Sequence, residues 1–201
     1  MQARSNGPLK LVLAVDGHSM FYAQQKLGWF FDPKRLLKLA CTQFDMELSS
    51  AFWYAGLKDS SDQRGFRYAL TNLGYTVRTR LLRELPSQGD DLRHSDHQPG
   101  DQRSYTRANL EVDIAIDLLT VAPRCDELWL LSGSRDLDRL VEVLRTQGLR
   151  ITLMSTEGMV ARDLRNAADR FVDLASLRSE LERSEAQQAP VFARGERTPD
   201  P

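Results

Sequence analysis

The chain has few of the features that mark specialised protein classes. Only two cysteines, Cys41 and Cys125, occur among its 201 residues, far apart and without metal-ligand spacing. This argues against a disulfide framework or a cysteine zinc site and predicts reduced thiols in a cytoplasmic protein. The N-terminal "MQARSNGPLK" lacks the apolar run of a signal peptide, and no window approaches 18 apolar residues. We therefore expect neither export nor a membrane span.

Net charge of one sign is also lacking, because 27 basic residues are offset by 28 acidic ones. The molecule as a whole exerts no strong attraction on nucleic acid or membranes, so any polyanion site must arise from local clustering. Internal repeats are absent as well. The chain does have the 41% hydrophobic and 27% charged residues of a globular protein with a closed core.

Apolar runs alternate with helical patterns along the chain. This order predicts an α/β fold with a mostly parallel β-sheet flanked by helices and joined by right-handed crossovers. The expected strands are 9–15, 50–57, 75–82, 127–131 and 148–154; the expected helices are 32–44, 63–74, 109–122 and 137–147, and 158–174 completes the fold. Asp32 and Pro33 have the residue types of an N-cap and first helical position.

Composition divides the chain into one domain and two terminal segments. Residues 1–8 form an N-terminal extension and 9–178 the folded domain. Residues 86–106 are polar and rich in turn formers, which predicts a long mobile loop. From 179 to 201 apolar periodicity is lost, so we expect a disordered tail.

Several acids should meet at one edge of this sheet. Asp16 ends the first strand, Asp136 follows the strand 127–131, and Glu111 or Asp113 begins a helix at the same edge. Ligands of such sheets bind beyond the carboxyl ends of the strands. Crowded carboxylates repel one another, and a hard divalent ion, Mg²⁺ or Mn²⁺, relieves that repulsion. The ion also supplies a water for phosphodiester hydrolysis.

Each acid has a purely structural alternative. Asp136 is also suited to N-cap the helix 137–147, where Ser134 is a rival cap. Glu111 and Asp113 are also suited to complement the helix dipole. Asp117 shares a helix face with Asp113 but lies about 9 Å deeper than Glu111, at about 1.5 Å per residue. Geometry therefore favours Asp113 over Asp117, and only the joint placement of the acids favours a metal site.

Four ordered blocks resemble the NYN domain family, and more narrowly its LabA-like branch. They are "VDGHSMFYAQQKLGWFFDPKRLL", "RANLEVDIAIDLL", "LLSGSRDLDRLVEVLR" and "STEGMVARDLRNAADRFVDL", within about residues 9–178. The resemblance implies a three-layer, PIN-like nuclease fold and a ribonuclease that depends on Mg²⁺ or Mn²⁺. The metal-binding and catalytic residues that it implies are Asp16, Glu111, Asp117 and Asp136, with Asp113 and Asp138 in reserve. In the LabA-like branch it also implies dampening of clock-controlled gene expression.

The chain departs from the family pattern beside the expected metal. The family's asparagine after Asp-Gly is replaced, with His18 and Ser19 in that neighbourhood, and Ser134 replaces the first aspartate of the Ser-Gly-Asp turn. Loss of that carboxylate weakens affinity for a divalent ion. Arg135 is suited either to a scissile phosphate or to an ion pair with Asp138. The residues near the site are Gly17, His18, Ser19, Ser132, Gly133, Ser134 and Arg135.

A basic strip is the candidate RNA contact. Five arginines and no acid lie between Arg64 and Arg83, interleaved with aromatic residues. Such a strip suits phosphate contacts and base stacking, or forms a solvated face above a core. We assign RNA binding to Arg78, Arg80, Arg83 and Arg107.

The sequence leaves two main functions open. One is a metal-dependent ribonuclease, weakened by Ser134. The other is a catalytically impaired NYN protein that binds RNA or protein and regulates gene expression. A small-molecule phosphohydrolase draws on the same acids but has no nucleophile motif of its own. RNA is the expected partner, a regulatory protein the second, and the oligomeric state stays open.

Overall fold

The computed structural model describes residues 7–42, 46–59, 61, 63–85, 105–107 and 109–183. In this part of the chain, six parallel strands form a central sheet in the order β3-β2-β1-β6-β7-β8. This confirms the predicted α/β class. The strands of the sheet are β1 Leu9–Asp16, β2 Met46–Leu57, β3 Thr76–Leu81, β6 Glu127–Leu131, β7 Arg150–Ser155 and β8 Arg170–Asp173. A separate antiparallel pair is formed by β4 Arg83–Leu85 and β5 Tyr105–Arg107.

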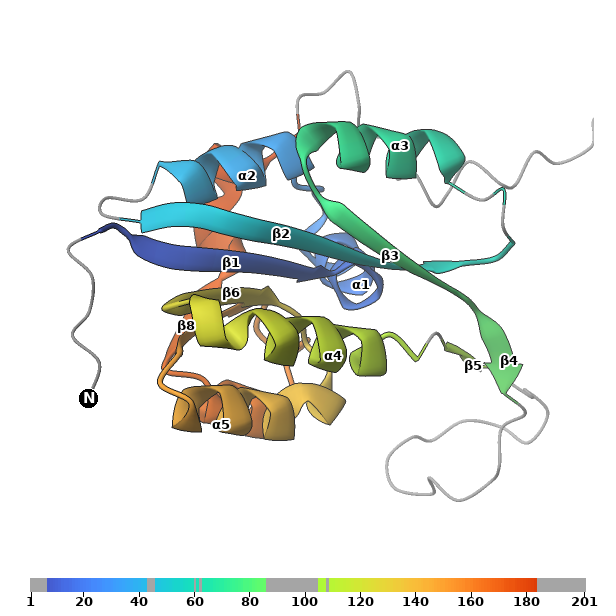
Figure 1. The fold of residues 1–201 in the computed structure, drawn as a ribbon. Coiled ribbons are helices and arrows are strands. Elements are labelled where there is room, and N and C mark those ends of the chain that lie inside the picture. Colours follow the sequence, from blue (N-terminus) through green and yellow to red (C-terminus); the bar gives the residue numbers. More distant parts are fainter. Residues whose placement is uncertain are drawn as a thin grey trace, which may run out of the picture.

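Helices cover both faces of the sheet, which gives three layers (Figure 1). One face carries α1 Gly17–Leu27, α2 Pro33–Cys41, α3 Arg64–Leu73 and α7 Arg178–Leu181. The other carries α4 Glu111–Val121, α5 Asp138–Thr146 and α6 Arg162–Ala167. Short 3₁₀ turns are η1 Ala122–Arg124, η2 Arg135–Leu137 and η3 Leu174–Leu177.

The sheet separates two apolar cores. On β1, Leu11, Leu13 and Val15 pack toward α1 and α2, while Val12 and Ala14 pack toward α4 and α5. Successive side chains of a strand point to opposite faces, so a strand buried on both sides has an unbroken apolar run. This explains the continuous run that ends at Asp16.

Local signals fix several helix ends. The Asp32 carboxylate accepts a hydrogen bond from the Lys34 N–H at 2.8 Å, and Pro33 is the first residue of α2, as predicted. Gly74 ends α3 with φ 102°, a left-handed conformation that glycine adopts without strain. Helix α2 ends at Cys41; the expected extension to residue 44 runs into residues 43–45, which lie outside the described part.

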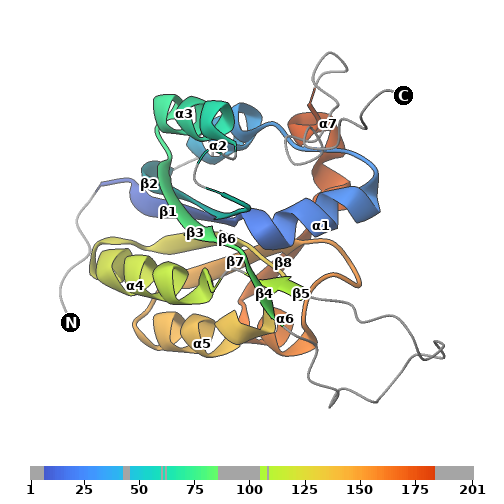
Figure 2. The same cartoon turned by 90° about the vertical axis from the view of Figure 1, so that its right-hand side faces the viewer.

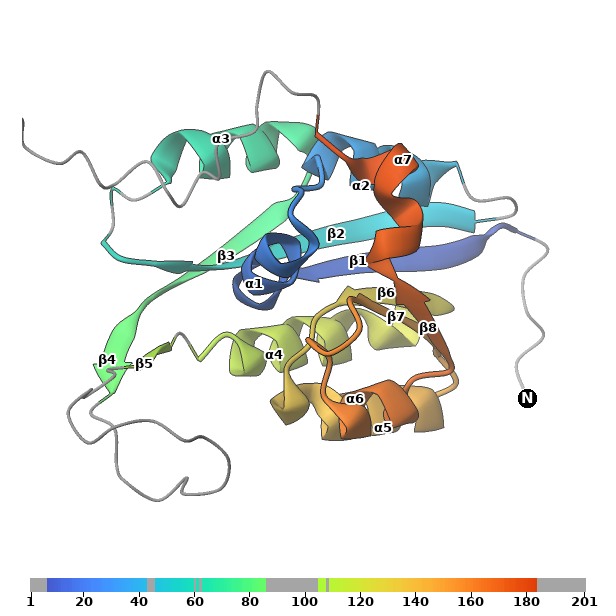
Figure 3. The same ribbon diagram turned by 180° about the vertical axis from the view of Figure 1, so that it is seen from behind.

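The folded chain extends past the expected boundary at residue 178. Leu181 is fully buried, its carbonyl accepts the Asp32 N–H at 2.8 Å, and the Arg183 N–H donates to the Phe30 carbonyl at 2.8 Å. Figure 3 shows α7 lying against α2. The residue pattern from 179 to 183 is too short to show helical periodicity, so burial of one leucine decides this segment. Residues 184–201 lie outside the described residues.

The expected loop 86–106 is described only at its end. Tyr105 and Thr106 belong to β5, and residues 86–104 lie outside the described part, as do residues 1–6 of the N-terminal extension. No described helix has the length and apolar character needed to cross a membrane.

Candidate active site at the carboxyl edge of the sheet

A row of polar residues crosses the sheet where the strands end. In the strand register, Tyr54 on β2 is the partner of both Asp16 on β1 and Arg78 on β3. Ser132 follows Leu131, which pairs with Val15, so it lies beside Asp16 on the other side. The parallel strands thus bring residues from four distant segments to one level, at the edge where ligands of such sheets bind.

Asp16 is the buried centre of this row, with 5% of its surface exposed. One carboxylate oxygen accepts the Ser19 N–H at 3.0 Å and caps α1, while the other accepts the Ser132 hydroxyl at 2.8 Å. Burial raises the pKa of Asp16, while the hydrogen bonds of Ser19 and Ser132 and the charge of His18 lower it; the charge of Glu111, which raises it, is the smallest of these contributions. Asp16 ends β1 and Glu111 begins α4, so both acids lie at the carboxyl edge of the sheet.

The turn after β6 is tied to both neighbouring segments. The Gly133 N–H donates to the Ser19 hydroxyl at 2.7 Å, and its carbonyl accepts the Ala161 N–H at 3.1 Å. A Cβ on Gly133 would lie 2.0 Å from the Met159 carbonyl oxygen, so only glycine fits there. Ser134 occupies the place of the missing acid, and its hydroxyl donates to Glu111 Oε1 at 3.3 Å.

Two of the predicted acids are bound by arginines. Arg78 donates twice to Asp117, at 2.9 Å each, and Arg80 donates twice to Asp113, at 2.6 and 2.7 Å. The Tyr54 hydroxyl also donates to Asp117, at 3.3 Å. Arg80 lowers the pKa of Asp113. Helix α4 is thus clamped to β3 by residues predicted separately as metal ligands and as RNA contacts.

The spacing of these pairs was available in the sequence. Two residues along a strand span about 6.6 Å, and four residues along a helix span about 6 Å. Arginines at i and i+2 on a strand therefore match aspartates at i and i+4 on a facing helix. Sequence reasoning considered the two sets separately and also missed Tyr54, a single phenol in the apolar run "SAFWYAGL".

The remaining acids lie around the turn η2. Asp136 is in the first turn of η2, and the Asp138 carboxylate accepts the Arg139 N–H. Arg135 pairs with Asp163 at 2.9 Å, not with Asp138. Within the described residues, no three of the Asp, Glu, His and Cys side chains form a group able to hold a metal ion. The described contacts join Ser134 to Glu111 and Ser132 to Asp16 at this edge, and Asp117 is bound by Arg78.

Two carboxylates at this edge, those of Asp16 and Glu111, are candidate ligands for Mg²⁺ or Mn²⁺. Both carboxylates provide hard oxygen atoms, and Mg²⁺ commonly binds one or two carboxylates together with waters and substrate phosphates. Asp16 already has a hydrogen bond on each oxygen, at 3.0 and 2.8 Å. The residues therefore fit an ion whose coordination is completed by a bound phosphate.

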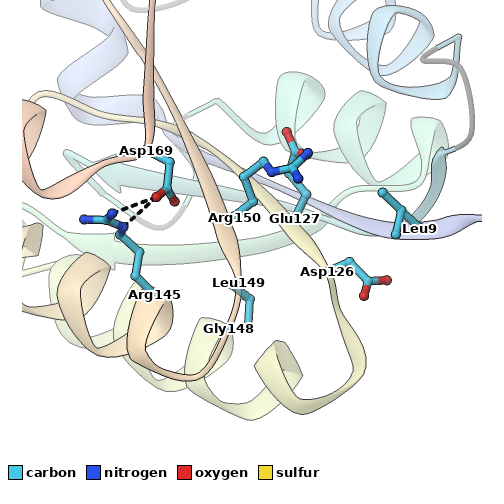
Figure 4. Close-up of a pocket in the computed structure, with 8 residues that line it drawn as sticks. All are labelled: Leu9, Asp126, Glu127, Arg145, Gly148, Leu149, Arg150 and Asp169. Carbon is cyan, nitrogen blue, oxygen red and sulfur yellow. Dashed lines mark hydrogen bonds and ion pairs between the residues drawn. The ribbon is translucent and has the colours of Figure 1, made fainter. Parts of the chain in front are cut away.

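A separate cavity of about 320 Å³ lies at the opposite edge of the sheet (Figure 4). It opens at the amino ends of β6 and β7, where Glu127 and Arg150 begin these strands. The Arg145–Asp169 ion pair, at 2.8 Å, forms part of its wall. None of the predicted site residues lines this cavity.

The parallel three-layer fold and the acid at the end of its first strand define a class, the NYN domains. The NYN domain model matches residues 10–177, so the chain belongs to this family. It is 46% identical over 190 residues to the "Low amplitude and bright protein LabA" of Synechococcus elongatus, covering 92% of this chain and 97% of that protein. This confirms the LabA-like resemblance.

A solved structure shares the fold. A protein of unknown function from Vibrio parahaemolyticus superimposes with a TM-score of 0.63 at 24% sequence identity. The match covers 86% of this chain and 96% of the other. At this identity the similarity concerns the fold alone.

Proposed function

We propose that the chain is a metal-dependent ribonuclease of the NYN type that works with a reduced set of acids. The observation that supports this most is the buried Asp16 carboxylate at the carboxyl edge of the sheet, oriented by Ser19 and Ser132, with Glu111 at the start of α4 on the same edge. Burial disfavours the charged form of a carboxylate, and a cation bound beside it relieves that cost. Such perturbed acids are concentrated at functional sites.

The chain's own groups have distinct roles in this proposal. Asp16 and Glu111 provide the charge that binds Mg²⁺ or Mn²⁺. The Ser132 hydroxyl and the Ser19 N–H fix the orientation of the Asp16 carboxylate, and the Ser134 hydroxyl orients Glu111. The bound ion would activate a water and neutralise charge on the scissile phosphate. Asp136 is a further candidate ligand, and Asp117 becomes one on release from Arg78.

We place RNA contacts first on Arg83 and Arg107. These residues are directly opposite each other in the β4–β5 pair. Arg78 and Arg80 each give two hydrogen bonds to Asp117 and Asp113, which leaves fewer of their N–H donors for a phosphate. The free thiols Cys41 and Cys125 support the expected reducing cytoplasm as the place of action.

Cleavage of single-stranded RNA in the presence of Mn²⁺ tests the proposal. The wild type is compared with Asp16→Asn, which keeps the size of the side chain and removes its charge. Glu142→Gln is the matched control, since Glu142 lies exposed on α5 and pairs with Arg139. We expect cleavage by the wild type and the control and at least about a hundredfold less by Asp16→Asn, the scale of a lost charged catalytic group. Equal cleavage by all three proteins would refute the proposal that the chain is a ribonuclease.

A second candidate is an NYN protein that binds RNA or protein and regulates gene expression without cutting. The Arg78–Asp117 clamp and the Ser134 hydroxyl support this candidate, because both stand where a nuclease would present free carboxylates. Retention of labelled RNA by the wild type, without cleavage at any Mn²⁺ concentration, would favour it.

A further inference from the structure

Exposed apolar side chains gather at one edge of the molecule. The described residues contain seven exposed large hydrophobic side chains, and six of them lie on α3, β3 and α4. These six are Tyr68 and Leu73 on α3, Leu81 on β3, and Val112, Ile116 and Leu119 on α4. Large exposed apolar patches mark interaction sites. We call α3, β3 and α4 together the β3 edge; Figure 2 shows the three elements on one side of the molecule.

Strand β3 is the outermost strand of the sheet on this side. It pairs with β2 on one side, and no described strand pairs with it on the other. Five of its six residues are exposed, and only Val77 is partly buried. An edge strand presents a row of backbone N–H and C=O groups that can pair with another chain.

Helix α4 turns an apolar stripe to the outside of the same edge. Val112, Ile116 and Leu119 are 58%, 59% and 40% exposed. Their spacing of four and then three residues is that of a seam along which two helices pack. Ile116 lies at the middle of the stripe, so it can meet its own copy when two such helices cross antiparallel.

The two arginines of β3 are already neutralised. Free Arg78 and Arg80 would repel the same arginines of a second copy, and charged side chains protect exposed sheet edges in this way. Here each guanidinium is bound to a carboxylate of α4, Arg78 to Asp117 and Arg80 to Asp113. Strand β3 and helix α4 thus present apolar groups and closed ion pairs, so the arginines of β3 do not repel their copies.

We propose that two copies of this chain associate through the β3 edge. A two-fold axis perpendicular to the sheet would pair β3 with its copy antiparallel and extend the sheet across both subunits. The α4 stripes then pack together on one face, and the two α3 helices come together on the other. A two-fold dimer needs one surface that is complementary to itself, and this edge satisfies that need.

The size of the edge agrees with a stable dimer. A strand of this length spans about 20 Å, and three packed layers span roughly 30 Å at about 10 Å between layers. The resulting footprint is on the order of 600 Å², close to the ~800 Å² per partner of a standard interface. The stripe on α4 alone is much smaller, so the strand and both helices must take part.

The mass of the full chain in solution tests this proposal. Analytical ultracentrifugation over a range of concentrations should show a dimer for the wild type. Ile116→Lys places a charge at the centre of the stripe on an exposed position, and Leu81→Lys does the same on β3. Each should raise the dissociation constant by more than roughly a hundredfold, because two charges would be buried per dimer. Tyr22→Lys is the control, since Tyr22 is 46% exposed on α1, outside the β3 edge.

Each outcome decides the proposal. A dimer for the wild type and Tyr22→Lys, with monomers of native circular dichroism for the other two variants, supports it. A monomeric wild type at 100-micromolar-range concentrations, or a dimer that both variants retain, overturns it. A monomeric wild type that retains RNA more tightly on Ile116→Lys overturns it too and assigns the edge to RNA. Cleavage activity does not enter the measurement, so the result is independent of the nuclease proposal.

Discussion

The Ser134 hydroxyl lies 3.3 Å from Glu111 Oε1 and joins the turn after β6 to the first residue of α4. A carboxylate at position 134 would instead face Glu111 and lie near Asp16. The serine therefore replaces a repulsive contact by a hydrogen bond and relieves the charge crowding of the site. This stabilises the metal-free protein and lowers the charge that attracts a cation.

The first prediction concerns this position. Ser134→Asp should lower the melting temperature without metal and raise Mn²⁺ affinity by about tenfold, the scale of one added carboxylate ligand. The rise in melting temperature on Mn²⁺ addition measures that affinity without any need for activity. Ser134→Asn, of equal size but without charge, is the control. An identical Mn²⁺ response of the two variants would contradict the assigned site.

The second prediction concerns pH and the Arg80–Asp113 pair. Arg80 lowers the pKa of Asp113 in the folded protein. An acid with a lowered folded pKa adds stability above its unfolded pKa of about 3.9 and loses it as pH falls through the folded value. Arg80→Ala should therefore melt at a lower temperature than the wild type at pH 7, and the difference should shrink as pH falls below about 4.

The control for this experiment is Arg139→Ala. Arg139 makes an exposed ion pair with Glu142 on the surface of α5. Exposed pairs contribute little to stability, so this variant should melt close to the wild type at both pH values. A constant difference between Arg80→Ala and the wild type at every pH would show that the pair is not the cause.

The third prediction concerns the turn at Gly133. Gly133→Ala would bring a Cβ within 2.0 Å of the Met159 carbonyl oxygen, so backbone must move. We expect a loss of about 2–4 kcal/mol in the free energy of unfolding, as for other overpacked or strained positions. Gly65→Ala is the matched control, because nothing lies within 4 Å of a Cβ there and the site is in α3. It should be neutral or stabilise by up to about 1 kcal/mol. Equal effects in urea unfolding would contradict the close contact.

The fourth prediction concerns the end of the domain. Leu181 is fully buried, and its carbonyl accepts the Asp32 N–H. Leu181→Ala should cost about 2–5 kcal/mol of unfolding free energy, because a large apolar group leaves the core. Glu180→Ala, at an exposed neighbouring position, should change stability by less than about 0.5 kcal/mol. An unfolding curve of Leu181→Ala that coincides with that of Glu180→Ala would place the boundary near 178 after all.

Much of the fold followed from local patterns. The apolar run before Asp16 identified a strand buried on both sides, and Asp32 with Pro33 identified the start of α2. The expected end of the domain at residue 178 lies before the last packed residues. Residues 179–183 are too few to show periodicity, and only the packing of Leu181 shows that they belong to the domain.

The candidate site was predictable in outline and not in its connections. The parallel sheet places Asp16 and the start of α4 at one edge, and the role of these acids stays a prediction. Which acids stay free depends on side chains from other strands. Arg78 binds Asp117 across 39 residues of sequence, and the matching spacings of the two pairs do not by themselves say which strand faces which helix.

By itself, the sequence determined the α/β class, most of the sheet strands, the acid at the end of β1 and the resemblance to the NYN family; α1, β8 and the β4–β5 pair were not predicted. Periodicity and turn chemistry act over a few residues, and these features are local. Only the tertiary structure decided that Arg78 and Arg80 close on Asp117 and Asp113, that Ser134 bonds Glu111, and that α3, β3 and α4 share an exposed apolar edge. The register between strands and the packing of helices set these contacts, because each joins groups that meet only after the chain has folded.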